Sequence, residues 1–213
     1  GLTTEDPMMF YKYGWLFAFK TNYDNAYGKY WTYFKEANVN HVRLHSSVKS
    51  RSNYDVMDEL GLLVVDELSY PETAIKSPSR ADLISVKGFD GACDAQGNLL
   101  PEFQTYLKER IRRAYSHPCI CTYSFGNEIC YDYKPSRTVN MLNNIYDLYA
   151  KTDKQQRPRT SSSGRAAPES IQYFDFLSKN EKSDYLDMHD YSGSLRQTPF
   201  FQAFPLFAKY LET

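Results

Sequence analysis

The sequence predicts an α/β fold, because short apolar runs alternate with longer stretches in which apolar residues recur at helical spacing. The helical stretches are long enough to connect parallel strands. The chain has 213 residues, of which 42% are hydrophobic, so it can bury a sizeable core. Six successive strand and helix steps can be assigned along the chain.

The first half of the chain carries three predicted strands separated by two helices. Aromatic residues recur at helical spacing from Tyr27 to Phe34, and Gly61 suits the left-handed position that ends a helix. An uninterrupted apolar run follows Gly61, as expected of a strand covered on both faces. These patterns predict strands at 10–19, 41–45 and 62–65, and helices at 23–37 and 53–60.

A long insertion at about 69–101 interrupts this alternation, because several Pro and Gly residues are scattered through it. Long loops in compact domains are often functional. The alternation then resumes, and Pro118 ends the next helix. The expected elements are helices at 102–117, 136–151 and near 171–177, and strands at 119–125, 159–162 and 185–189.

Two architectures connect parallel strands through helices of this size, an open doubly wound sheet and a (β/α)8 barrel. No glycine-rich phosphate-binding motif follows any predicted strand, which removes the main support for a nucleotide-binding doubly wound sheet. The sequence therefore favours a (β/α)8 TIM barrel, incomplete in this chain, with strands one to about six present.

Charge and composition exclude several kinds of partner and cofactor. The 25 Lys and Arg residues balance 26 Asp and Glu residues, so neither a nucleic acid nor an anionic membrane is an expected partner. No apolar run approaches the roughly 20 residues of a membrane helix. The four cysteines lack the paired spacing of a zinc site, and we expect no metal and no cofactor.

Polar residues follow the ends of most predicted strands, and the carboxyl ends of barrel strands meet at one rim. Arg43 is expected to point into the barrel as an ion-pair partner of rim carboxylates. A rim with several carboxyl groups suits cleavage of a glycosidic bond, which uses one carboxyl group as an acid and another as a nucleophile or base. The rim residues are His45, Asp66, Glu67, Asn127, Glu128, His189, Asp190 and Tyr191.

Three segments, 40–45, 58–67 and 117–128, resemble in order and spacing the barrel domain of glycoside hydrolase family 2, the β-galactosidase and β-glucuronidase group. The resemblance implies an enzyme that cleaves a terminal β-linked sugar of a glycoside or oligosaccharide with retention of configuration. It implies that Glu128 is the acid/base, that Asn127 binds the sugar 2-hydroxyl and that Tyr191 orients the nucleophile.

Other residues are assigned less directly. His45 and His189 are candidates for substrate contact, and each can equally be a structural residue hydrogen-bonded to a loop. Tyr123 stands where the family usually has Trp. Ala74 stands where the β-galactosidases have His, so the resemblance does not extend to galactose specificity.

The nucleophile has two possible locations. Glu212 delivers it if the segment before it is a seventh strand, but Phe200, Phe204 and Phe207 recur at helical spacing, which favours a helix there and a nucleophile beyond Thr213. The resemblance therefore implies that residues 1–213 are part of the barrel, and that N-terminal β-sandwich domains and the last barrel strands, which would be its partners, are missing.

A second class of function fits the same residues. A glycan-binding or inactive homologue would keep the barrel rim without catalysis, because a shared fold does not establish activity.

Overall fold

A computed structural model of the chain describes residues 2–4, 23–45, 50–68, 91–127, 129, 135–162, 180–185 and 187. Over these ranges strands and helices alternate, as the sequence predicts. They are β1 (Leu2–Thr4), α3 (Tyr23–Glu36), β2 (His41–Leu44), α4 (Arg51–Leu60), β3 (Leu63–Glu67), α5 (Pro101–Ala114), β4 (Ile120–Ser124), α6 (Pro135–Thr152) and β5 (Arg159–Thr160). None of the described helices is long and apolar enough to span a membrane.

The five strands form one sheet in the order β1-β2-β3-β4-β5, and every neighbouring pair is parallel. In a doubly wound sheet the strand order reverses at a switch point. Here the strands lie in the sheet in the same order as in the sequence, with no reversal, as in the wall of a barrel. The sheet therefore confirms the α/β class and the partial (β/α)8 barrel.

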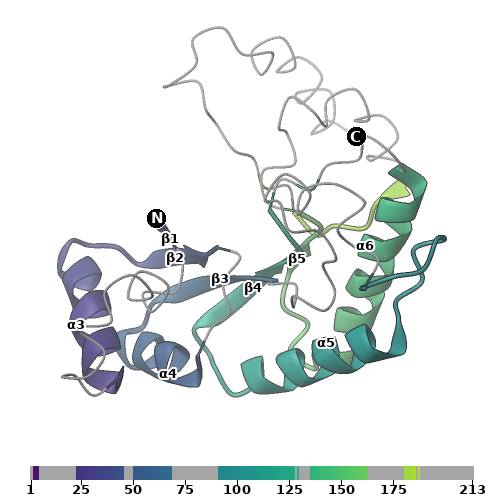
Figure 1. The fold of residues 1–213 in the computed structure, drawn as a ribbon. Coiled ribbons are helices and arrows are strands. Elements are labelled where there is room, and N and C mark those ends of the chain that lie inside the picture. The colour runs from purple at the N-terminus through teal and green to yellow at the C-terminus, as the bar shows by residue number, and fades with distance from the viewer. Residues whose placement is uncertain are drawn as a thin grey trace, which may run out of the picture.

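The four helices lie on the same side of the sheet (Figure 1). Because each of them connects two consecutive parallel strands, the helices form the outer layer of the barrel wall and the opposite face of the sheet is its interior. Helix α3 packs against α4, and α5 packs against α6. The side chains from Val64 to Glu67 of β3 are all buried, as expected of a strand that is covered on both faces.

Helix α4 shows how local sequence sets the position of a strand. The Ser50 side chain caps its first turn by accepting a hydrogen bond from the Asn53 backbone N–H. Gly61 ends the helix at φ 62°, ψ 41°, the left-handed conformation that the sequence predicts for it. The chain therefore turns sharply into β3, whose last residues lie at the rim.

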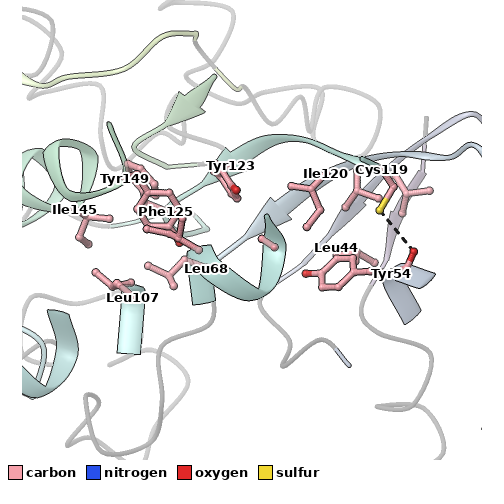
Figure 2. Close-up of a cluster of buried hydrophobic side chains, with 14 of the residues drawn as sticks. Leu44, Tyr54, Leu68, Leu107, Cys119, Ile120, Tyr123, Phe125, Ile145 and Tyr149 are labelled. Atoms are coloured by element: carbon pink, nitrogen blue, oxygen red, sulfur yellow. Dashed lines mark hydrogen bonds between the residues drawn. The ribbon is translucent and has the colours of Figure 1, made fainter. Parts of the chain in front are cut away.

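The core between the sheet and the helices is continuous across the described units (Figure 2). Leu68 and Phe125, which follow β3 and β4, pack with Leu107 of α5 and Tyr149 of α6, and all four side chains are buried. Cys119 is buried in the same layer, and its Sγ lies 3.8 Å from the Tyr54 carbonyl oxygen. Cys119 therefore packs in the core.

Hydrogen bonds to Asp184 connect the described segment 180–185 to β5 and α6. Its carboxylate accepts hydrogen bonds from the Arg159 backbone N–H at 2.9 Å, from Arg159 Nε at 3.1 Å and from the Tyr146 hydroxyl at 2.6 Å. Partial burial opposes ionisation, but these donors outweigh it and lower the pKa of Asp184 below its ordinary value.

This lowered pKa predicts an acid-sensitive contribution to stability. A carboxyl group whose folded pKa lies below its unfolded pKa stabilises the fold above the unfolded value and ceases to do so as the pH falls through the folded value. Asp184→Asn should therefore lower the melting temperature at pH 7 and have a smaller effect near pH 3. Thermal unfolding of both proteins at the two pH values tests this. An equal difference at both would contradict it.

Most described elements differ from the predicted ones by a few residues at their ends, and the helix predicted at 102–117 ends at Ala114. Two differences are larger or affect the site. The strand that pairs with β2 is β1 at Leu2–Thr4, which the sequence analysis missed because three residues are too few for a periodic pattern. Strand β3 extends through Glu67, so Asp66 and Glu67 belong to the strand. The predicted strand at 10–19, most of the insertion at 69–101, and the elements predicted near 171–177, 185–189 and 200–211 lie wholly or mostly outside the described residues.

Candidate active site at the strand ends

A buried ion pair lies at the carboxyl ends of β2 and β3. Arg43 Nε donates a hydrogen bond to Glu67 Oε2 at 2.9 Å, and Arg43 Nη2 contacts the same oxygen. The Glu67 side chain has no exposed surface and that of Arg43 is 10% exposed. This confirms the prediction that Arg43 points into the barrel towards a rim carboxylate.

The same guanidinium group also donates a hydrogen bond to the side chain of Asn127, which follows β4. Arg43 Nη2 lies 2.6 Å from Asn127 Oδ1. A guanidinium group has only donors, so the side-chain atom of Asn127 that faces it must be the carbonyl oxygen. The amide NH₂ of Asn127 therefore points away from Arg43, and Asn127 offers a hydrogen-bond donor at the rim.

His45 lies beside this group. Its Nε2 is 4.0 Å from Glu67 Oε1, which is too long for a hydrogen bond, and its side chain is 22% exposed. His45 directly follows β2, and its distance to Glu67 places it on the barrel side, next to Arg43. Of the predicted rim residues, the structure thus brings His45, Glu67 and Asn127 together.

Asp66 has a different role from its neighbour Glu67, because successive side chains of a strand point to opposite faces of the sheet. Asp66 points to the helix layer, where it accepts a hydrogen bond from the Tyr54 hydroxyl at 2.6 Å and two from Arg110 Nη2 at 2.8 and 2.7 Å. Burial and the Asp66 carboxylate raise the pKa of Tyr54 well above its ordinary value. Asp66 is a structural residue here.

Tyr123 also belongs to the helix layer. Its ring packs edge-on against Tyr149 at 4.9 Å between centroids, and its hydroxyl accepts a hydrogen bond from Arg157 Nη1 at 2.9 Å. Burial raises the pKa of Tyr123 well above its ordinary value. A residue in this position does not face the barrel interior.

The other predicted site residues, Glu128, His189, Tyr191 and Glu212, lie outside the described residues, as does Asp190. The structure does describe both neighbours of Glu128 in the sequence. Asn127 is held by Arg43, and the Ile129 backbone N–H donates a hydrogen bond to Ser162 Oγ at 3.1 Å. Sequence reasoning missed Ser162, because serines at the end of a short strand carry no pattern that marks them.

One group in the described part of the chain has ligand atoms close enough to hold a metal ion, namely Asp55, Asp58 and His117. These residues lie near the amino end of β4, at the opposite end of the sheet from the rim. Asp58 accepts hydrogen bonds from His117 Nδ1 and from the Cys119 backbone N–H, both at 2.7 Å. These bonds connect α4 to the start of β4 and give Asp58 and His117 a structural role.

Parallel β/α units in sequential order, with a buried charged cluster at their carboxyl ends, define the class of α/β barrel proteins that carry their sites at this rim. A family model, "Glycosyl hydrolases family 2, TIM barrel domain", matches residues 28–194. The chain belongs to this family. No curated protein sequence gave a match.

Several solved structures are similar to the chain. The β-glucuronidase 2 of Bacteroides uniformis superposes with a TM-score of 0.51 at 22% sequence identity, over 75% of this chain and 18% of that one. The exo-chitosanase CsxA of Amycolatopsis orientalis gives a TM-score of 0.47 at 16% identity, over 76% of this chain and 16% of that one. The chain therefore spans less than a fifth of the length of these enzymes. The similarity to the Bacteroides uniformis enzyme shows the fold alone.

Proposed function

We propose that the chain is part of the catalytic barrel of a retaining glycoside hydrolase that releases a terminal β-linked sugar. Family membership supports the reaction class. The observation that supports the site is the contact between Arg43 and Asn127, because it presents an amide donor at the rim immediately before Glu128 in the sequence.

In this proposal Glu128 first protonates the glycosidic oxygen while a second carboxylate attacks the anomeric carbon, which forms a covalent glycosyl-enzyme and releases the aglycone. Glu128 then removes a proton from the water that hydrolyses this intermediate. The second carboxyl group must lie about 5–5.5 Å from the first. It is Glu212 or a glutamate beyond Thr213.

The amide NH₂ of Asn127 is assigned to a sugar hydroxyl, to which it donates a hydrogen bond while the Asn127 carbonyl oxygen faces Arg43. His45, His189 and Tyr191 complete the proposed substrate contacts. The buried Glu67 carboxylate holds Arg43 and is not itself a candidate nucleophile, since it has no exposed surface.

The proposed domain is a TIM barrel of which residues 1–213 form one part, with an insertion at about 69–101. N-terminal β-sandwich domains and the remaining barrel strands of the full protein are its proposed partners. No nucleic acid or membrane partner is proposed.

Hydrolysis of aryl β-glycosides by the full-length protein tests the function. We expect turnover of at least one of the β-glucoside, β-galactoside and β-glucuronide of p-nitrophenol, and none of the corresponding α-glycosides. Proton NMR of the early reaction should show the β-anomer of the free sugar, which then mutarotates. An α-anomer as first product would exclude retention, and sugar binding without turnover would instead indicate a glycan-binding protein.

A further inference from the structure

A groove between α5 and α6 gathers most of the uncompensated positive charge in the described part of the chain. It has a volume of about 750 Å³, and its lining includes Lys108, Arg112, Lys151 and Lys154. Among the described residues, one other cationic side chain, that of Lys29 on α3, also has no hydrogen bond or ion pair. Of the five described cationic side chains that have no hydrogen bond or ion pair, four therefore line this groove.

The helix dipoles account for the positions of only two of these four cations. Cations are favoured in the last turn of a helix, and Arg112 and Lys151 occupy the last turns of α5 and α6. Lys108 lies a turn earlier and Lys154 lies beyond the end of α6. A chain with a formal net charge of −1 has no general excess of cations to distribute, so this concentration indicates an anionic ligand.

The side chains that line the groove distinguish between two kinds of anionic ligand, an acidic peptide helix and an acidic sugar. An amphipathic acidic helix would need a row of exposed apolar anchors, but Ile111 in the floor is only 1% exposed. The principal exposed apolar group in the lining is the ring of Tyr115, which is 45% exposed. A flat amphipathic ring surrounded by cations suits the face of a charged sugar better than a peptide helix.

The arrangement along α5 also suits a polymer. Lys108, Arg112 and Tyr115 follow one another at intervals of four and three residues and therefore lie on one face of the helix, with about 5.4 Å between turns. A second hollow of about 330 Å³ adjoins the groove and shares Gln104, Leu148 and Lys151 with it. Its own lining adds no further cation, and its one carboxylate, Asp147, is paired with Lys182 at 2.7 Å. An extended acidic ligand can thus lie along Lys108, Arg112 and Tyr115 on this face of α5.

We propose that this groove is a second carbohydrate-binding site, which holds an acidic polysaccharide through its carboxylate or sulfate groups. The groove lies on the outer helix layer, and Tyr115 at one end of it lies shortly before the amino end of β4, opposite the rim of Glu67 and Asn127. It binds sugar without cleaving it. The inference is independent of the proposed catalytic activity, because it is measured as binding.

Calorimetric titration of the full-length protein tests the proposal with four probes. Hexagalacturonate carries carboxylates, a heparin-derived hexasaccharide carries sulfates as well, cellohexaose is neutral, and poly-L-glutamate is an acidic peptide. We expect at least one acidic saccharide to bind, with an affinity that falls as salt rises. Cellohexaose should not bind to the groove, and poly-L-glutamate should bind more weakly because it has no sugar face to stack on Tyr115.

Variants then locate the binding. Lys108→Gln with Lys154→Gln should weaken binding of the acidic saccharide about two- to five-fold for each charge removed. Tyr115→Ala should weaken it about two- to ten-fold. The matched control is Lys29→Gln, which removes an equally unpaired cation outside the groove and should leave binding unchanged.

Three results would overturn the proposal. They are the absence of binding by either acidic saccharide, an equal loss of binding in Lys29→Gln and the groove variants, and binding of poly-L-glutamate as tight as that of the saccharides. The last result would assign the groove to an acidic protein segment. All the substituted side chains are exposed, and circular dichroism of each variant checks that the fold is unchanged.

Discussion

Glu128→Gln in the full-length protein is expected to reduce kcat/KM for an alkyl β-glycoside by about 10²–10⁴-fold, the usual contribution of a general acid. Glutamine has nearly the shape of glutamate but cannot transfer a proton, so sugar binding should be almost unchanged. The loss should be smaller for a p-nitrophenyl glycoside, whose leaving group needs little protonation. Steady-state kinetics with both substrates, together with the affinity of a competitive sugar ligand, provide the measurement.

Azide gives an independent check of the assigned role. It is a nucleophile that needs no base, so it should restore turnover of the p-nitrophenyl glycoside in Glu128→Gln by attacking the glycosyl-enzyme and forming a β-glycosyl azide. Glu109→Gln on the exposed surface of α5 is the matched control and should have wild-type kinetics. Wild-type activity in Glu128→Gln would exclude the acid/base role.

Glu67→Gln is expected to lower the free energy of unfolding by about 3–5 kcal/mol, because it breaks the buried ion pair between Glu67 and the Arg43 guanidinium. Glu109→Gln again serves as the control. It removes one charge of an exposed pair with Arg113 at 4.0 Å, and should cost about 0–1 kcal/mol. Denaturant unfolding of the two variants measures the difference.

A double variant distinguishes the loss of this ion pair from a general packing defect as the cause of the lower stability. Glu67→Gln combined with Arg43→Gln removes both charges, and should be more stable than Glu67→Gln alone. If the two single losses simply add in the double variant, the two side chains are not coupled. The double variant should also have reduced activity, because Asn127 would no longer be held by a guanidinium group.

The helices follow largely from local patterns. The predicted helix at 23–37 and the observed α3 end within one residue of each other, because aromatic residues at helical spacing need a helix to reach one core. Gly61 caps α4 as predicted, because only glycine adopts the left-handed conformation without strain. The short strand β1 could not be found in this way, because its three residues become a strand only by pairing with β2.

The rim was predictable in outline, because parallel strands in a barrel must bring their carboxyl ends together. Sequence position alone could not divide the roles of Asp66 and Glu67. The two residues are adjacent, acidic and buried. In the structure the Asp66 side chain lies on the helix side of β3, where it binds Arg110, and the Glu67 side chain lies on the barrel side, where it binds Arg43. A shift of one residue in the strand would exchange them.

The sequence by itself determined the barrel class, the family and the candidate acid/base Glu128, since these depend on periodicity and on motifs that are contiguous in the chain. Only the tertiary structure decided which way the Asn127 amide faces, because that depends on a donor 84 residues away. It likewise decided that four unpaired cations share one groove. Contacts between distant segments arise from packing in three dimensions, and no local pattern in the chain encodes them.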